Sequence, residues 1–443
     1  MTQLTQSKHG CKSFGAKYFK GSVAMPPARQ MTDATLGPNS GSASEPEAIA
    51  RSLGASEGGK ATGQASESRE RPVAIDLCCG LGGLSEGLRM AGFDVRLGLD
   101  YSASAVVTYQ QNNPGSLVAL QDLSQLRKFK SYLAAVGIAP GHLDVLAGGT
   151  PCQSFSAANS RKRPGRNEHH NLVLEFARLV SESHPSAFVL ENVPRMASTD
   201  GGSLLNEFLS RMEGSGYQVV HQVLCAADYG VPQTRRRLFI VGSRVGRFQF
   251  MRPTHGPESF LGKPHVTVRD AILGDLPPPV RRARVDSPMV YTGAPTTWYQ
   301  RWSRVGSKAV TDHSWNDLGD IPIRRFEMIP AGLSWDQVQR STSVPEDLRI
   351  RIEHRSVYRR LDPDKPAFTV VHPRKAMIVH PTQNRLLTIR EAARLQSFRD
   401  RFVFARFGGK VLQYDEIQQQ LANAVPPLLA RAVARRLVSR LER

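Results

Sequence analysis

The sequence has few cysteines, no long apolar run and a shortage of acidic residues. It contains 5 Cys among 443 residues, and no two of them have the C-x2-C spacing. This pattern argues against a zinc module and against a disulfide scaffold, and we expect no metal site. No apolar run is long enough to span a bilayer, and the N-terminus lacks the apolar stretch of a signal peptide. We therefore expect a soluble, cytoplasmic protein with no membrane partner.

The shortage of acidic residues leaves a large positive charge. There are 58 Lys and Arg against 39 Asp and Glu, which gives a formal net charge of +19 at pH 7. This balance indicates a polyanionic partner, with nucleic acid as the first expectation and an anionic membrane surface as the second. Hydrophobic residues make up 40% of the chain, enough for a sizeable core and too many for wholesale disorder.

The chain divides into four segments by composition. Residues 1–70 are rich in small and polar residues without a sustained period, which predicts a flexible low-complexity tail. Residues 71–245 alternate apolar runs with helical patterns and predict a first folded domain. Residues 246–375 are rich in Pro, Arg, His and Trp without that rhythm, and predict a second, smaller and irregular domain. Residues 376–443 contain a capping box and an amphipathic helix pattern, and we expect them to return to the first domain.

Short apolar runs in the first domain predict buried strands. Strands that alternate with helices favour an open, doubly wound and mostly parallel α/β sheet with helices on both faces. Ligands of such sheets bind outside the carboxyl ends of the strands, where we expect each motif below to lie. The predicted strands span residues 73–78, 95–100, 117–120, 143–147, 187–191, 217–224 and 237–241.

The first motif follows the first predicted strand. Gly80, Gly82 and Gly83 would let the backbone approach a ligand and leave helix N–H groups free, although a plain tight turn explains glycines equally well. Asp100 and Asp122 end the next two strands, where carboxylates suit ribose hydroxyls and an adenine amino group. We interpret the region as a site for an adenosine-containing ligand. The glycine spacing is not G-x-G-x-x-G, which disfavours a dinucleotide.

Three further motifs carry reactive groups. Cys152 follows Pro151 just beyond a strand, where a thiol is presented to a ligand; an inert buried cysteine is the alternative. Glu191 ends a buried strand, where desolvation favours its protonated form; a helix cap is the alternative. Arg235 and Arg237 precede and begin the last strand, with the groups to bind a phosphate and a carbonyl oxygen; a solvated basic face is the alternative.

Taken together and in this order, the motifs resemble those of the DNA (cytosine-5)-methyltransferase family. The resemblance runs from Val73 to the C-terminus, and its elements are Pro151-Cys152-Gln153, Glu191-Asn192-Val193, the Gln233-x-Arg-x-Arg run, residues 385–398 and residues 421–427. It implies the Rossmann-like fold of S-adenosylmethionine-dependent methyltransferases, with the irregular second domain as a target-recognition domain.

The resemblance also implies S-adenosyl-L-methionine as the methyl donor. Its amino acid part, ribose and adenine would be surrounded by Asp76, Cys78, Gly80, Gly82, Gly83, Asp100, Asp122, Asn423 and Val425. The family usually has Phe where Cys78 stands and Pro where Arg399 stands. At Cys78 this difference removes the ring that lies against the adenine in the family, a place that another side chain can take.

The roles in the reaction follow from the groups and from the resemblance. Cys152 would add to C6 of cytosine, and Glu191 would bind N3 and the exocyclic amine. Arg237 would lie near O2, with Arg235 against the ring or a phosphate. The target base would rotate out of the duplex, with Gln153 and Ser156 contacting the displaced strand or the gap.

We therefore expect a monomeric bacterial or phage modification enzyme that acts on double-stranded DNA at the nucleoid, with a separate cognate restriction endonuclease as a further hypothesis. An RNA cytosine-5 methyltransferase and a catalytically silent DNA-binding homologue are alternatives. The large irregular domain favours duplex DNA over RNA, and the presence of Cys152, Glu191 and Arg237 disfavours the silent homologue. A nicotinamide oxidoreductase is disfavoured by the glycine spacing.

Overall fold

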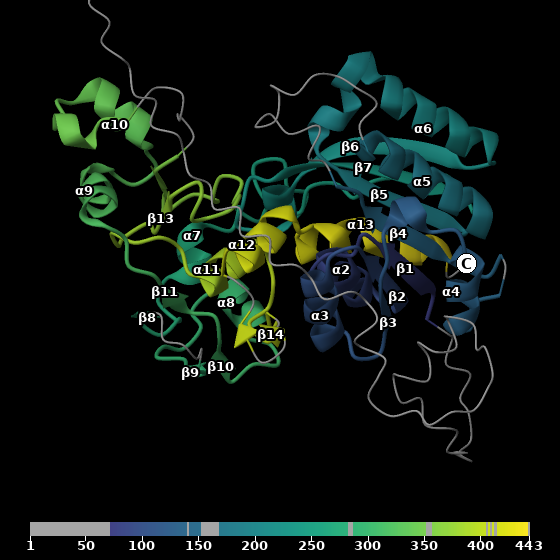
Figure 1. Ribbon diagram of the computed structural model, residues 1–443, viewed down its shortest axis with the longest axis horizontal. Coiled ribbons are helices and arrows are strands. Elements are labelled where there is room, and N and C mark those ends of the chain that lie inside the picture. The colour runs from purple at the N-terminus through teal and green to yellow at the C-terminus, as the bar shows by residue number, and fades with distance from the viewer. Residues whose placement is uncertain are drawn as a thin grey trace, which may run out of the picture. The chain divides into compact units, whose positions relative to one another are not determined.

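The structure, a computed structural model, describes residues 71–139, 141–151, 168–281, 287–350, 357–404, 406–407, 410–411 and 414–441 (Figure 1). All of them belong to one structural unit, Ser56–Arg443. The predicted tail, residues 1–70, lies outside the described residues. In the part of the chain that is described, no helix is both long and apolar enough to cross a membrane.

A seven-stranded sheet with the order β3-β2-β1-β4-β5-β7-β6 organises the unit. β1 to β5 are parallel, and β7 runs antiparallel between β5 and β6. The predicted doubly wound, mostly parallel sheet is confirmed. The strands are β1 (Val73–Leu77), β2 (Asp94–Asp100), β3 (Leu117–Leu120), β4 (Val145–Gly149), β5 (Ala187–Asn192), β6 (Gln218–Cys225) and β7 (Arg236–Ser243).

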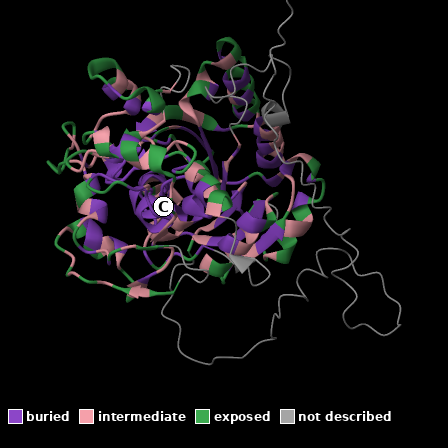
Figure 2. Cartoon of the chain, turned by 60° about the vertical axis from the view of Figure 1, so that its left-hand side comes forward, coloured by how far each residue is buried: buried purple, intermediate pink, exposed green. Residues whose placement is uncertain are grey.

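Helices cover both faces of the sheet because the central strands carry apolar side chains on both sides. Along β5, Val189 belongs to one hydrophobic cluster, and Phe188 and Leu190 belong to the other. The cluster around Phe188 includes residues of α4 (Phe129–Ala135), α5 (Glu168–Ser183) and α6 (Ser203–Gly214). The cluster around Val189 includes residues of α2 (Gly83–Ala91) and α13 (Pro427–Leu441). Figure 2 shows the buried residues concentrated on the sheet and on the helix sides that face it.

The C-terminal segment returns to the first half of the chain through α2 and α13. A Cβ atom placed on Gly87 would lie 2.3 Å from the Cβ of Ala430, and one on Gly83 would lie 2.1 Å from the carbonyl oxygen of Val425. Only glycine therefore allows the two helices to approach this closely. This packing holds Val425 and the start of α13 close to the helix that follows the first strand.

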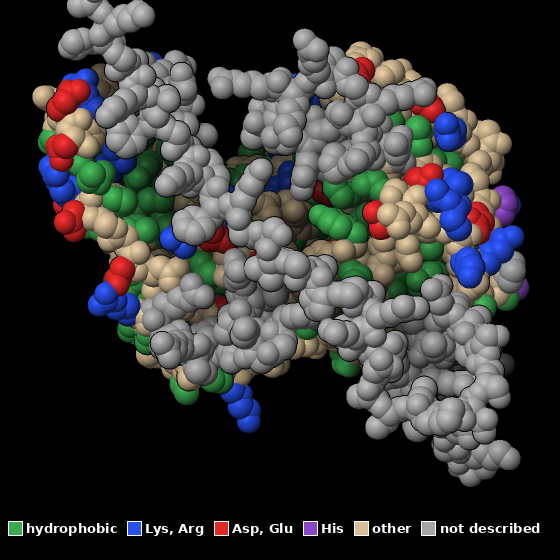
Figure 3. Space-filling model, in the orientation of Figure 1, with side chains coloured by type: hydrophobic (Ala, Val, Ile, Leu, Met, Phe, Trp, Pro, Cys, Tyr) green, Lys and Arg blue, Asp and Glu red, His purple; other side chains and the backbone are tan. Residues whose placement is uncertain are grey.

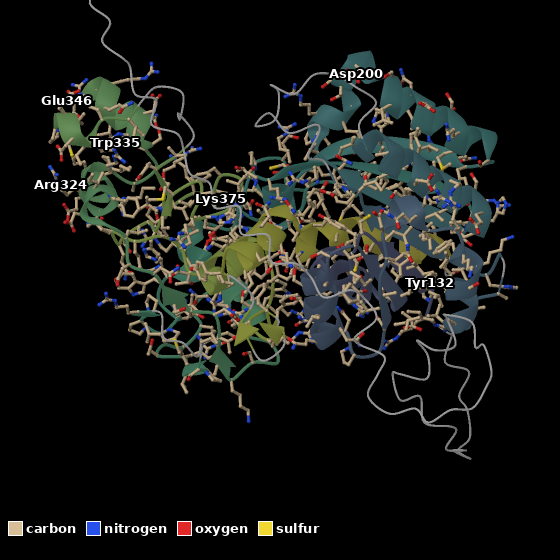
Figure 4. All side chains as sticks on the ribbon, in the orientation of Figure 1. Tyr132, Asp200, Arg324, Trp335, Glu346 and Lys375 are labelled. Carbon is tan, nitrogen blue, oxygen red and sulfur yellow. The ribbon has the colours of Figure 1, made fainter. Side chains whose placement is uncertain are left out.

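The described residues between positions 246 and 375 contain only short elements, as the sequence predicts. Trp335 is fully buried in a small hydrophobic cluster that is separate from the two clusters on the sheet. Figure 4 labels it near Arg324 and Glu346 in the region of α9 and α10. The helices are α7 (Val268–Ile272), α8 (Trp298–Ser303), α9 (Asp320–Met328) and α10 (Trp335–Ser341), and the two-residue strands are β8 (Val280–Arg281), β9 (Met289–Val290), β10 (Ala309–Val310), β11 (Ser314–Trp315) and β12 (Arg359–Arg360).

Buried arginines connect this irregular region to the helix that follows it. Thr388 and Glu391 form the predicted capping box at the start of α11 (Ile389–Leu395), which comes after β13 (Ile378–Val379). From α11, the fully buried guanidinium of Arg394 donates to Asp275 at 2.7 Å and to Asp400 at 2.6 Å. Since a guanidinium offers five N–H donors, one such side chain can join segments that share no regular sheet.

Candidate active site

The carboxyl ends of β1, β2, β4 and β5 face a cavity of about 340 Å³, which we call the edge cavity. The start of β7 reaches the same edge because β7 is antiparallel to β5. Two further short elements contribute to its wall, the residues that begin α3 (Ala103–Asn112) and the end of α12 (Tyr414–Asn423). Predicted site residues that line it are Asp76, Cys78, Gly80, Gly83, Asp100, Glu191, Arg237, Asn423 and Val425.

Pro151 also lines the edge cavity, directly before the predicted nucleophile. Cys152 itself lies outside the described residues, as do Gln153 and Ser156. Asn192 anchors the segment that leads to them, since its side-chain Nδ2 donates to the hydroxyl oxygen of Thr150 at 3.0 Å. The chain therefore passes the wall of the cavity immediately before Cys152.

Asp76 is fully buried at the floor of the edge cavity. Its Oδ2 accepts a hydrogen bond from the hydroxyl of Ser85 at 2.5 Å, and the same hydroxyl lies 2.7 Å from that of Tyr109. Its Oδ1 is buried and has no hydrogen-bond partner among the described residues. Burial raises the pKa of Asp76 to about 7, although the bond from Ser85 opposes the rise. A cationic ligand group at Oδ1 would satisfy this oxygen and favour its ionised form.

Asp100 holds the turn after β1 in its shape. Its two carboxylate oxygens accept the backbone N–H groups of Gly80 at 2.8 Å and of Ser102 at 2.9 Å. Cys78 and Gly80 adopt left-handed φ angles of 56° and 52°, so the turn folds back sharply. Burial raises the pKa of Asp100, and these backbone bonds act against the rise. Asp100 therefore supports the turn in addition to facing the cavity.

The N-terminus of α2 is open toward the edge cavity. Gly82 is its N-cap residue, with a left-handed φ of 89° and no side-chain cap, and it does not itself line the cavity. Gly83 and Leu84, the first residues of α2, do line it. Free N–H groups at a helix N-terminus attract negatively charged groups, so this part of the wall suits a carboxylate.

Several residues of the cavity wall were not predicted from the sequence. Tyr101 lines the cavity beside Asp100 and is 63% exposed, which makes its ring accessible to a ligand. Glu416 and Gln420 of α12 reach it from the C-terminal segment, where both bond to the hydroxyl of Ser104, at 3.2 and 2.6 Å. The sequence signal available for Tyr101 was its position, an aromatic residue directly after the acid of the second predicted strand. No local sequence pattern identifies the residues of α12, because they reach the cavity through contacts with residues more than three hundred positions earlier in the chain.

Besides Gly82, two of the predicted site residues that the structure describes do not line the edge cavity. Asp122 does not line the edge cavity; its Oδ1 accepts from the N–H and the hydroxyl of Ser124 and caps a short 3-10 turn, Leu123–Gln125. Arg235 is fully buried and does not line the cavity; it donates to the carbonyl oxygen of Ala422, a residue of the cavity wall, at 2.7 Å. Arg235 therefore contacts the C-terminal segment. This contact differs from the predicted one, which was with a ring or a phosphate.

Glu191 and Arg237 form an ion pair in the wall of the edge cavity. The Nε of Arg237 lies 2.9 Å from Oε1 of Glu191, and the two side chains are 13% and 7% exposed. Burial raises the pKa of Glu191, while Arg237 and Arg235 act in the opposite direction. A Cβ on Gly149 would stand 3.4 Å from Oε2 of Glu191, so glycine leaves that oxygen room. The pair places a carboxyl group and a guanidinium side by side in the cavity wall.

Gln233 secures the segment that leads to Arg237. It is fully buried, and its amide donates to the carbonyl oxygen of Leu395 at 3.0 Å and accepts from the N–H of Val370 at 2.8 Å. Thr234 adds a backbone bond to the carbonyl oxygen of Ala367. The start of β7 is thus fixed by residues that follow it by more than a hundred positions.

Comparison with known proteins identifies the family. The model of C-5 cytosine-specific DNA methylases matches residues 73–439. This chain belongs to that family. The type II methyltransferase M.AgeI of Thalassovita gelatinovora is 32% identical over 81% of this chain and 97% of its own length. The type II methylase M.HgiDII of Herpetosiphon aurantiacus is 32% identical over 84% of this chain and 96% of its own length.

Solved structures agree with the assignment. A DNA modification methyltransferase encoded within an E. coli prophage is 26% identical, with a TM-score of 0.66, and the match covers 84% of this chain and all of that one. The predicted family, the methyltransferase fold and the enzyme class are therefore confirmed. This cytosine-5 methyltransferase uses S-adenosyl-L-methionine as its methyl donor.

Proposed function

We propose that this methyltransferase modifies carbon 5 of one cytosine within a specific double-stranded DNA sequence, by way of a transient bond between Cys152 and C6 of a flipped base. One observation carries the proposal. The Glu191–Arg237 pair and the unsatisfied Oδ1 of Asp76 belong to the same cavity wall. Groups that suit a cytosine edge are therefore adjacent to groups that suit the methyl donor.

The described residues fit S-adenosyl-L-methionine. Its ammonium group matches the buried, unpartnered Oδ1 of Asp76, and its carboxylate matches the open N-terminus of α2 at Gly83. Asp100 would hold the ribose, and Asn423 and Val425 would close the pocket. The exposed ring of Tyr101 is our candidate for the adenine contact that Cys78 cannot supply. The donor, once bound, supplies an electrophilic methyl group.

Asp122 and Arg235 take different roles in this proposal. The Oδ1 of Asp122 is engaged by Ser124, and the contact of Asp122 with the donor stays a prediction. We reassign Arg235 as a positioning residue. Its bond to Ala422 supports the segment that carries Asn423, and its charge lowers the pKa of Glu191 from a buried position.

The chain's own groups would drive the chemistry on the cytosine. The Cys152 thiolate forms a bond to C6, which moves an electron pair toward C5 and makes that carbon nucleophilic. Protonated Glu191 donates to N3 and accepts from the exocyclic amine, so that negative charge does not collect on the ring. Arg237 neutralises charge that develops at O2. After C5 has taken the methyl group and lost its proton, the ring expels the sulfur.

The remaining segments would deliver the DNA. We assign residues 71–245 to catalysis, residues 246–375 to target recognition and residues 376–443 to completion of the catalytic unit. Rotating a base out of the duplex costs a few kcal/mol, which phosphate contacts from a chain of net charge +19 help to offset. Gln153 and Ser156 follow Cys152 directly and are our candidates for contacts with the opened duplex.

The biological setting is proposed from the relatives. The two relatives described above are a type II methyltransferase and a type II methylase by name. We propose that this chain likewise protects DNA at the nucleoid as a monomer, with a separate restriction endonuclease as its counterpart.

Bisulfite sequencing tests the proposed function. Plasmid DNA is incubated with the full chain and S-adenosyl-L-methionine, and cytosines that resist conversion are mapped. We expect protection at one position of one short motif, and none with Cys152→Ala. Absence of protected cytosines with a folded wild-type protein, or protection scattered without a motif, would contradict the proposal.

A further inference from the structure

Basic side chains are spread over the face drawn in Figure 3, with acidic ones between them. One hollow, in contrast to this mixed surface, is lined by several arginines and one acidic residue. It lies along the second half of α2, whose first residues line the edge cavity, and has a volume of about 380 Å³. We call it the arginine hollow, and it is lined by Glu86, Arg89, Met90, Trp302, Arg399, Arg401 and Arg431.

The charges of the arginine hollow do not balance. Glu86 is its one acidic residue, and it pairs with Arg401 at 2.7 Å. Arg89 is engaged by Asn113 and other neighbours. The Nε atoms of Arg399 and Arg431 are buried and have no hydrogen-bond acceptor among the described residues.

The unpartnered groups of the arginine hollow are all donors. They are the Nε atoms of Arg399 and Arg431 and the indole Nε1 of Trp302, each buried and without an acceptor in the described chain. The guanidinium of Arg399 lies 5.3 Å from the centre of the Trp302 ring, which fixes its plane. A hollow whose unpartnered polar groups are all donors suits an anionic ligand. Such a ligand would bind the outer N–H groups of the two guanidiniums.

Repulsion between the arginines of the hollow also favours an anionic ligand. Burial lowers the pKa of Arg431, and the nearby charges of Arg435 and Arg399 lower it further. Burial also lowers the pKa of Arg399, with Arg401 adding to the effect and Glu86 opposing it. Like charges held together in partial burial disfavour the folded state unless an anion compensates them.

We propose that the arginine hollow is a phosphate-binding site, separate from the edge cavity, in which Arg399 and Arg431 hold the phosphate. The planar fork of a guanidinium binds phosphate through two parallel hydrogen bonds, which a phosphodiester and a phosphate monoester both accept. The phosphate belongs either to the backbone of a bound duplex or to a free phosphorylated small molecule. This inference does not depend on the roles proposed for Cys152 or Glu191.

Tripolyphosphate is the probe that tests the site, titrated calorimetrically into the full chain. The variant Arg399→Gln/Arg431→Gln is compared with Lys128→Gln/Lys130→Gln, which removes two exposed charges at the start of α4. We expect the hollow variant to bind about tenfold more weakly or worse, since two charged hydrogen-bond donors are lost. The α4 variant should bind like the wild type. Equal affinity in all three proteins, or an equal loss in both variants, would overturn the proposal.

A second variant, Arg399→Lys/Arg431→Lys, distinguishes a loss of the binding site from a loss of folding. It keeps both charges but loses the guanidinium forks, and we expect weakened tripolyphosphate binding at an unchanged melting temperature. Binding at wild-type strength in this variant would refute a site built on the two forks.

The salt dependence of duplex binding then distinguishes the two sources of phosphate. If the backbone of DNA occupies the hollow, the Gln variant should lower the slope of log K against log salt by about two units, and the α4 variant should not. An unchanged slope together with lost tripolyphosphate binding identifies a free phosphorylated ligand. Retained tripolyphosphate binding in the Gln variant rejects the site whatever the slope.

Discussion

The Nε of Arg237, at the start of β7, lies 2.9 Å from Oε1 of Glu191, near the end of β5. The two residues meet because β7 runs antiparallel to β5, with Leu238 opposite Asn192 in the register. In a fully parallel sheet, the start of β7 would lie at the opposite edge. One reversed strand therefore brings a cation to the carboxyl group that faces the edge cavity.

The pH dependence of catalysis tests the Glu191–Arg237 pair. If protonated Glu191 is the active form, kcat/KM should fall as the pH rises through its elevated pKa. Arg237 acts to lower that pKa. Arg237→Gln should therefore reduce kcat/KM by about 10²–10³-fold and move the falling limb to higher pH. The pH profile of single-turnover methylation measures both effects, and a limb that stays in place or moves to lower pH would refute the assigned role.

Binding of the methyl donor should depend on the ionisation of Asp76. Its pKa of about 7 in the donor-free protein means that it becomes anionic, and able to pair with the ammonium group, only as the pH rises through 7. Affinity should then increase on the order of tenfold between about pH 5.5 and 7.5. Calorimetry should find this increase in the wild type and in Asp122→Asn. Asp76→Asn should abolish it, and a persistent pH dependence in that variant would mean that another group binds the ammonium.

Arg394 should be a major contributor to stability. Removing it by Arg394→Met leaves Asp400 buried without its ion-pair partner and Asp275 with only Arg304, at 3.9 Å, which costs about 3–5 kcal/mol in the free energy of unfolding. The matched control is Arg211→Met, which breaks an exposed pair with Glu207 and should cost less than about 1 kcal/mol. Urea unfolding curves measure both. A loss in Arg394→Met no larger than that in the control would show that the network is dispensable.

Much of the edge cavity could be predicted because strand ends converge. Asp76, Asp100 and Glu191 end parallel strands, and the carboxyl ends of neighbouring parallel strands necessarily share an edge. The apolar runs themselves identify the strands, since both faces of the central sheet are buried. Position along the chain was therefore enough to bring these carboxyl groups together.

The directions of individual side chains could not be predicted in the same way. Arg235 precedes β7, so the alternation of a strand does not determine where it points; its acceptor is Ala422, 187 positions away. Glu416 and Gln420 likewise meet Ser104 across more than three hundred positions. Contacts of this kind depend on how α12 and α13 return, which no local pattern encodes. The antiparallel direction of β7 could not be predicted either, since the apolar periodicity of a strand is the same in both directions.

The covalent bond between Cys152 and the target base is the central claim, and trapping tests it most directly. A duplex with 5-fluorocytosine at the methylated position cannot lose a proton from C5, so the sulfur cannot be expelled after methyl transfer. Incubation with S-adenosyl-L-methionine should give a stable protein–DNA adduct, and mass spectrometry should map it to the peptide that contains Cys152, with no adduct in Cys152→Ala. Turnover of the normal duplex without any adduct on the fluorinated one, or an adduct on another residue, would contradict the account.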